Sequence, residues 1–130
     1  MYDIAIIGGG PAGLAAGLYG ARGGMDTVLL ENMLVGGQIT KTTQVDNYPG
    51  FPDGIDGFAI GTNMQKQAER FGLEIKRTGV DSVELEGEIK RLYCGREVIE
   101  AKAVIIATGA HPKKLELDRE EKLTGAGVSY

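Results

Sequence analysis

Apolar and polar positions in the first part of the chain predict a strand, a helix and a second strand. Residues 4–7 and 27–30 form short, mostly apolar runs, which are typical of parallel strands buried on both faces. Between them, residues 13–24 carry an apolar stripe at helical spacing, and the glycines at 23 and 24 are expected to end this helix. The pattern therefore predicts an α/β fold that begins with two parallel strands.

The middle of the chain predicts a second helix. Apolar residues, Met64 and Phe71 among them, recur on one helical face over residues 56–71, and this face is expected to pack in the core. Asp56 is a residue type that caps helix starts. Residues 73–75 follow as a short third strand.

From residue 80 onward the apolar positions change to an alternating pattern. Three short runs are separated by turn sequences at 86–88 and 94–96, which predicts a small antiparallel meander. The continuous apolar run at 103–107 predicts a separate, central strand of the parallel sheet. Thr108 and Gly109 follow it, at the carboxyl end of a strand, where such sheets bind ligands.

The turn after the first strand carries a motif for binding phosphate groups. Gly8, Gly10 and Gly13 fit G-x-G-x-x-G between a predicted strand and a predicted helix. Pro11 suits the first helical turn, where its missing N–H is no loss. The helix start would present free N–H groups and a positive dipole end to an anion. This context makes the motif strong and indicates a Rossmann-like, three-layer α/β fold that binds a dinucleotide.

Glu31 ends the second strand about 20 residues after Gly10, the spacing at which an acid accepts hydrogen bonds from a ribose. Its charge would repel a 2′-phosphate, so NADP(H) is not expected in this site.

The long segment at 32–52 is expected to be functional, because long ordered loops inside compact domains usually carry function. Gly36, Gly37 and Gln38 combine exposed backbone with an amide, and Thr43 and Asn47 add neutral hydrogen-bonding groups. Such groups suit a flat heteroaromatic ring, for example a flavin. The alternative is a loop that caps itself through threonine and asparagine hydrogen bonds.

Composition narrows the possible functions. With 130 residues the chain is expected to form about one domain. The net charge of −4 and the lack of a lysine or arginine run argue against a nucleic-acid partner. The sequence shows neither a signal peptide nor an apolar stretch long enough for a membrane, so the cytoplasm is the expected location.

The sequence offers no candidate for a catalytic residue or a metal ligand. Cys94 is the single cysteine, so an internal disulfide or Cys-x-x-Cys is excluded within these residues. Cys94 is interpreted as a bystander, His111 as a surface histidine without a partner at metal-ligand spacing, and Glu120 and Glu121 as solvated carboxylates.

Several motifs together resemble the low-molecular-weight thioredoxin reductases, which are flavoproteins with two dinucleotide-binding domains. The segments Gly36-Gly37-Gln38-Ile39 and VDNYPGF at 45–51, with Thr43 between them, look like the flavin loop of that family. ATGA at 107–110 and GAGVSY at 125–130 are similar to its end-of-domain motif and to the segment before its redox-active Cys-x-x-Cys. The resemblance covers essentially the whole chain.

The resemblance implies a flavoprotein disulfide reductase in which NADPH reduces FAD, FAD reduces a Cys-x-x-Cys disulfide, and the dithiol reduces thioredoxin. Residues 1–112 would form the N-terminal part of the FAD-binding domain, and 113–130 a linker toward an NADPH-binding domain. The redox cysteines, the NADPH domain and a later FAD-binding segment would lie outside these residues, so the fold is expected to be incomplete. The family is typically dimeric. Residues 115–119 depart from the family's Gly/Pro-containing turn.

The resemblance also assigns site residues: Glu31 to the adenosine ribose with Asn32 beside it, Val80 to the adenine, and Thr108 with Gly109 to the closure of the site. The complete set of expected FAD-binding residues is Gly8, Gly10, Pro11, Ala12, Gly13, Glu31, Asn32, Gly36, Gly37, Gln38, Ile39, Thr43, Asn47, Val80, Thr108 and Gly109.

Four alternatives remain open from the sequence. Two are related flavoproteins, a ferredoxin/flavodoxin-NADP reductase and an alkyl hydroperoxide reductase flavoprotein. The third is a plain NAD-binding dehydrogenase domain, which residues 8–31 alone would allow. The fourth is a catalytically silent dinucleotide-binding module.

Overall fold

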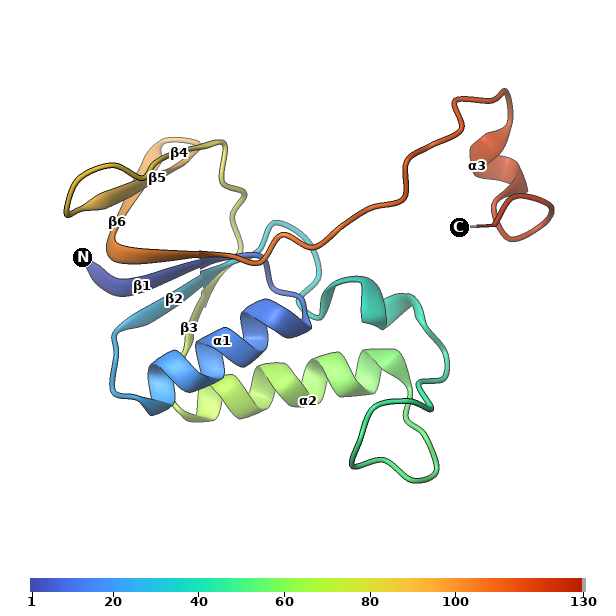
Figure 1. Cartoon of the computed structure of the whole chain (residues 1–130), viewed down its shortest axis with the longest axis horizontal. Coiled ribbons are helices and arrows are strands. Elements are labelled where there is room, and N and C mark those ends of the chain that lie inside the picture. Colours follow the sequence, from blue (N-terminus) through green and yellow to red (C-terminus); the bar gives the residue numbers. More distant parts are fainter. Residues whose placement is uncertain (130) are drawn as a thin grey trace.

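The fold is described from a computed structural model covering residues 1–129, and it is built on a single six-stranded sheet of order β3-β2-β1-β6-β5-β4 (Figure 1). β1, β2, β3 and the second half of β6 are parallel, and β4 and β5 are antiparallel to their neighbours. The elements are β1 (Tyr2–Ile7), α1 (Pro11–Arg22), β2 (Thr27–Leu30), the 3-10 helix η1 (Gly37–Lys41), α2 (Gly57–Arg70), β3 (Glu74–Lys76), β4 (Ser82–Glu84), β5 (Lys90–Cys94), β6 (Glu97–Ile106) and α3 (Glu120–Leu123).

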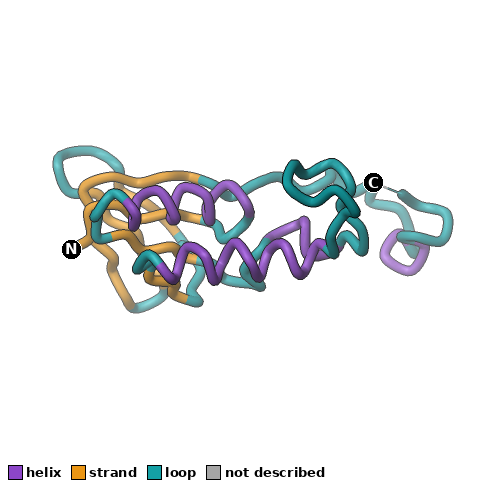
Figure 2. Tube along the Cα trace, turned by 90° about the horizontal axis from the view of Figure 1, so that it is seen from below, coloured by secondary structure: helices purple, strands orange, loops and turns teal. Residues whose placement is uncertain are grey.

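Two helices cover one face of the parallel strands. α1 and α2 run side by side and pack against each other (Figure 2). Ile6 and Leu29 of the sheet meet Leu14 of α1 and Ala68 of α2 in a core whose members are at most 6% exposed. Burying such aliphatic side chains stabilises the fold by about 1.5–3 kcal/mol each, which fixes α1 against the strand that precedes it.

The opposite face is covered by the β4–β5 hairpin, which makes the third layer. β6 changes partners along its length: Ala101 pairs with Lys90 of β5 on one side and with Tyr2 of β1 on the other. Beyond that point β6 continues beside β1. Leu92 and Ile99 pack onto the sheet from this layer. The three-layer α/β fold with a parallel sheet and an antiparallel meander is thus confirmed.

Two sequence predictions about strands and helix packing are corrected. The last run of the meander and the run at 103–107 are one ten-residue strand, β6, because no turn interrupts the alternation at residues 100–102. Its second half is not buried on both faces, since Ile106 is 62% exposed. Phe71 lies beyond the end of α2 rather than in the core, and its ring faces Arg22 and Arg70 at 5.8 and 4.9 Å.

Element ends differ slightly from the sequence prediction. α1 begins at Pro11 rather than at residue 13, because Gly10 already has the extended conformation of a residue that precedes a helix. Asp56 caps α2 as predicted. Among residues 1–129, the helices are all too short or too polar to cross a bilayer.

The segment after β6 leads away from the sheet to α3 (Figure 1). Glu120 is 7% exposed, and its carboxylate accepts hydrogen bonds from the backbone N–H groups of Leu115 and Glu116, at 3.0 and 2.8 Å. The prediction of a solvated carboxylate was therefore wrong for Glu120. Its negative charge replaces water as the acceptor for backbone donors of the preceding turn. Glu121 is exposed and pairs with Lys114.

Candidate dinucleotide site

A cleft of about 870 Å³ lies at the carboxyl edge of the parallel strands, where such sheets bind ligands. Three connections form its walls: the turn between β1 and α1, the segment from β2 through η1, and the segment that follows β6. Its volume lies within the range of small-molecule and cofactor sites.

The glycine turn allows backbones to pack where side chains would collide. Gly8 has φ +108°, and a Cβ there would overlap the carbonyl oxygen of Ala107 after β6. A Cβ on Gly13 would overlap the carbonyl oxygen of Gly8. A Cβ on Gly37 would lie 2.9 Å from the Cα of Gly10, so η1 and the glycine turn meet backbone to backbone. A side chain at Gly8 or Gly37 would therefore force two walls apart, and one at Gly13 would distort the glycine turn itself.

The start of α1 is open toward the cleft. Gly10 precedes the helix without a capping hydrogen bond from any side chain of residues 1–129, and Pro11 and Ala12 of its first turn line the cleft. The first N–H groups of a helix have no partners inside the helix. Together with the helix dipole they form a site for an anion.

Glu31 is held rigidly beside this turn. One carboxylate oxygen, Oε2, accepts a hydrogen bond from the Gly9 N–H, and the other, Oε1, accepts one from the Met33 N–H, both at 2.7 Å. Each oxygen keeps a further lone pair for a ligand hydroxyl. Asn32 lies against Gly79, because a Cβ on Gly79 would be 3.4 Å from the Asn32 side chain. Val80, next to Gly79, is therefore close to this end of the cleft.

The wall after β2 is tied to both other walls. The Gly36 N–H donates to the Gly9 carbonyl at 2.8 Å, and the Thr40 hydroxyl donates to the Gly37 carbonyl at 2.8 Å. Gln38 reaches the segment after β6: its Nε2 lies 3.3 Å from the Ala110 carbonyl oxygen and 2.7 Å from His111 Nδ1. His111 is exposed, as predicted for a surface histidine, and it also lines the cleft, where Gln38 is its partner.

The structure brings most of the expected site residues together and places the others around them. Those that line the cleft are Gly8, Gly10, Pro11, Ala12, Glu31, Gly37, Gln38, Ile39, Thr108 and Gly109. Gly13 and Gly36 are buried in the packing just behind the cleft wall. Asn32 and Val80 lie beyond Glu31, whereas Thr43 and Asn47 belong to the segment that leads away from η1.

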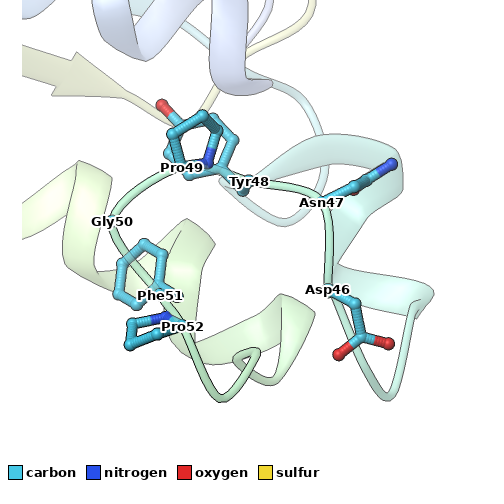
Figure 3. A pocket seen from close by; sticks show the side chains of 7 residues that line it. All are labelled: Asp46, Asn47, Tyr48, Pro49, Gly50, Phe51 and Pro52. Atoms are coloured by element: carbon cyan, nitrogen blue, oxygen red, sulfur yellow. The ribbon is translucent and has the colours of Figure 1, made fainter.

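A second hollow, of about 540 Å³, lies at the tip of that segment over residues 46–52 (Figure 3). Pairing between Val45 and Ile55 closes the tip into a small hairpin. Asn47 lines this hollow, and the rings of Tyr48 and Phe51 lie 6.2 Å apart in the same loop. Gln44 bonds to Asp46 and to the Asp53 carbonyl. The 32–52 segment is therefore partly held by its own polar contacts, through Thr40 in η1 and through Gln44 at the tip.

Sequence reasoning missed several residues that line the cleft. Met33, Leu34 and Ile106 are 75%, 51% and 62% exposed and present apolar surface to it. The sequence could have indicated them as cleft residues, because Met33 and Leu34 follow Glu31 closely and Ile106 directly precedes the ATG segment. His111 carried no such signal, because its partner is distant in the sequence.

Cys94 lies at the end of β5 and is 5% exposed. Burial raises the pKa of its thiol, so the thiol stays protonated and is a poor nucleophile at neutral pH. The burial of Cys94 agrees with its interpretation as a bystander and not a nucleophile.

Comparison with known proteins gives the same assignment along the whole chain. A thioredoxin reductase of Peptoclostridium litorale is 51% identical over 130 residues, which is 100% of this chain and 41% of the relative. A thioredoxin reductase of Peptoclostridium acidaminophilum is 47% identical over the same coverage. The crystal structure of Lactococcus lactis thioredoxin reductase superimposes with a TM-score of 0.89 at 40% identity, covering 100% of this chain and 43% of that chain.

The chain spans less than half the length of these relatives. The resemblance inferred from the motifs is nevertheless confirmed, because it extends over the glycine turn, the η1 wall and the segment after β6 alike. The family model for pyridine nucleotide-disulphide oxidoreductases matches residues 2–130, and the chain belongs to that family.

Proposed function

We propose that this chain binds FAD in the cleft and is the N-terminal FAD-binding part of a thioredoxin reductase. The observation that carries the proposal is the uncapped start of α1, which faces a cleft whose rim holds the fixed Glu31 carboxylate. An anion site and a ribose acceptor at this spacing match the two polar features of an adenine dinucleotide.

The residues present fit FAD along the length of the cleft. The pyrophosphate would lie at Gly10–Gly13, Glu31 would accept hydrogen bonds from the ribose, and the backbone near Val80 would receive the adenine. The flavin would lie past Gly37, between η1 and the segment after β6. Thr43 and Asn47 do not line the cleft, and their proposed contact with the flavin rests on the family resemblance.

In the complete protein, bound FAD would supply two-electron transfer from NADPH to a Cys-x-x-Cys disulfide, and the resulting dithiol would reduce thioredoxin. The proposal includes this activity. It also includes a homodimer located in the cytoplasm, and a boundary near residue 112 between the FAD-binding domain and a linker. The names of the thioredoxin reductase relatives support the activity, whereas the homodimer is carried over from the family resemblance and the location is the one expected from the sequence.

The test is to purify the complete protein and measure flavin absorbance and NADPH-dependent reduction of thioredoxin, for the wild type and for Gly10→Val. Gly10 has φ −74°, which any residue can adopt. The atom nearest to a Cβ added at Gly10 would be the Cα of Gly37, at 4.0 Å. Valine should therefore be tolerated by the fold yet occupy the space for the phosphates, so that flavin content and activity are both lost. Ala15→Val, on the exposed face of α1, is the matched control. Full flavin content in Gly10→Val would disprove the placement of the pyrophosphate.

A further inference from the structure

The end of the cleft away from Glu31 is bridged by one side-chain amide. Gln38 extends from η1, and its Nε2 contacts both the Ala110 carbonyl oxygen, at 3.3 Å, and His111 Nδ1, at 2.7 Å. The amide thereby joins the wall after β2 to the wall after β6. Residues on both sides of this bridge, Gln38 and His111 included, line the cleft.

The support beneath Gln38 is fixed. η1 begins where Gly37 packs against Gly10, and its first turn is closed by the Thr40 hydroxyl on the Gly37 carbonyl. The segment after β6 is exposed from Thr108 through His111 and has left the sheet. The Gln38 bridge therefore fastens an exposed segment to a rigid one.

The contacts also determine which way the hydrogen bonds run. A carbonyl oxygen accepts and never donates, so the Ala110 contact requires the NH₂ end of the amide at this position. The same NH₂ then donates to His111, whose Nδ1 must be the unprotonated acceptor. A side chain at residue 111 that keeps an acceptor at this distance should preserve the bridge.

We propose that Gln38 and His111 act as one hydrogen-bonded unit that closes the ring end of the cleft and holds residues 108–111 beside bound flavin. The inference rests on the proposed function, because Glu31 and the start of α1 assign the adenosine and pyrophosphate to the other end. Gln38 and His111 are positioning residues: they order the wall that the ring contacts. Their effect should therefore be confined to the flavin half of the ligand.

The experiment compares two probes on the complete protein, after flavin removal: FAD, which fills the whole cleft, and ADP, which fills the adenosine and pyrophosphate end and whose binding there is measured by its competition with FAD. Gln38→Leu and His111→Leu break the bridge, and His111→Asn keeps an acceptor near the position of Nδ1. Gln65→Leu is the matched control, because it breaks a side-chain hydrogen bond with Glu69 on α2, outside the cleft. The rate of FAD release and the affinities for both probes are measured, with the double variant Gln38→Leu/His111→Leu included.

Losing one such hydrogen bond should weaken FAD binding about tenfold and leave ADP affinity within about twofold. The double variant should be no weaker than either single leucine variant, because both remove the same unit, and His111→Asn should bind FAD like the wild type. Three outcomes would each overturn the inference. In the first, the two leucine substitutions weaken FAD binding additively; in the second, they weaken ADP binding as much as FAD binding; in the third, His111→Asn binds FAD as weakly as His111→Leu. A wild type that binds ADP and not FAD would overturn the proposed function, whereas normal FAD binding with an unaffected Gln38→Leu would overturn this inference alone.

Discussion

The two long helices begin in opposite ways, although they lie side by side. α2 begins after Asp56, whose carboxylate accepts a hydrogen bond from the Ala59 N–H at 2.9 Å. Even the first N–H of α2, that of Gly57, donates to the Thr42 carbonyl at 3.0 Å. α1 begins after Gly10, which has no side chain, and its first turn contains no acidic residue.

This difference separates a helix start that serves the fold from one that is available to a ligand. At α2 the protein supplies its own anion and closes the surface, since a Cβ on Gly57 would collide with the Ile39 and Thr42 carbonyls. At α1 the equivalent place is left open beside a cleft. A helix start whose N–H groups already have acceptors cannot donate them to a phosphate. The open start of α1 is therefore the one that indicates a ligand site.

The largest effect on FAD affinity is expected when the start of α1 receives a carboxylate cap like that of α2. Gly10 already has extended backbone, with φ −74° and ψ −177°, so Gly10→Asp can place a carboxylate over the first turn. The new cap should stabilise the flavin-free complete protein by about 0.3 kcal/mol, because a glycine cap is only a few tenths of a kcal/mol worse than an aspartate cap, and its charge should repel the pyrophosphate. FAD affinity should fall at least about 100-fold, or about 3 kcal/mol. Equilibrium unfolding and flavin titration measure the two effects, and Gly10→Asn, which caps without the charge, is the control.

A Gly10→Asp variant that unfolds more easily and also loses FAD would contradict the comparison, because the loss would then reflect damage to the helix.

A smaller effect is expected at Glu31, which lies between the glycine turn and the η1 wall. Glu31→Gln keeps the shape but offers one acceptor in place of two for the N–H groups of Gly9 and Met33. FAD affinity should fall about tenfold, and the free energy of unfolding of the flavin-free protein should fall by about 1–2 kcal/mol. Calorimetric titration with FAD and denaturant unfolding check both values. Unchanged FAD affinity would show that the carboxylate serves the loop and not the ribose.

The smallest effect concerns α2. Asp56→Ala removes the cap and should lower the free energy of unfolding by about 1 kcal/mol, while FAD affinity stays the same because the start of α2 is outside the cleft. Asp56→Asn, which keeps an acceptor, should recover most of the stability. A change in FAD affinity at Asp56→Ala would show that the two helix starts are not independent.

Local patterns were sufficient for much of the fold and for the glycine turn that lines the cleft. Residues 4–31 predicted β1, α1, the glycine turn and the position of Glu31 at the end of β2 correctly, because each depends on neighbours along the chain and on backbone constraints. The same holds for the Asp56 cap. These features need no knowledge of what lies across the sheet.

Features that depend on distant partners were missed. His111 meets Gln38 across the cleft, and Glu120 is buried because a turn folds back onto it; neither pairing leaves a periodic signal. Nor did any pattern indicate the pairing between Val45 and Ile55, which makes the segment around Asn47 a hairpin tip. The contact of Asn47 with a flavin stays a prediction. The single strand β6 was divided in prediction because its two halves have different neighbours and different burial.

The dual pairing of β6 also dictates when the cleft can exist during synthesis. β1 has its parallel neighbours in β2, which follows soon after it, and in β6, whose Ala101–Ile106 stretch is the last part of the sheet to be made. The pairing of Ile7 with Ile106 brings together residues 99 positions apart, the kind of contact that slows folding. The glycine turn cannot be completed before Ala107, which packs against Gly8, leaves the ribosome. Nascent chains shorter than this should expose an apolar sheet edge and depend on chaperones until β6 docks.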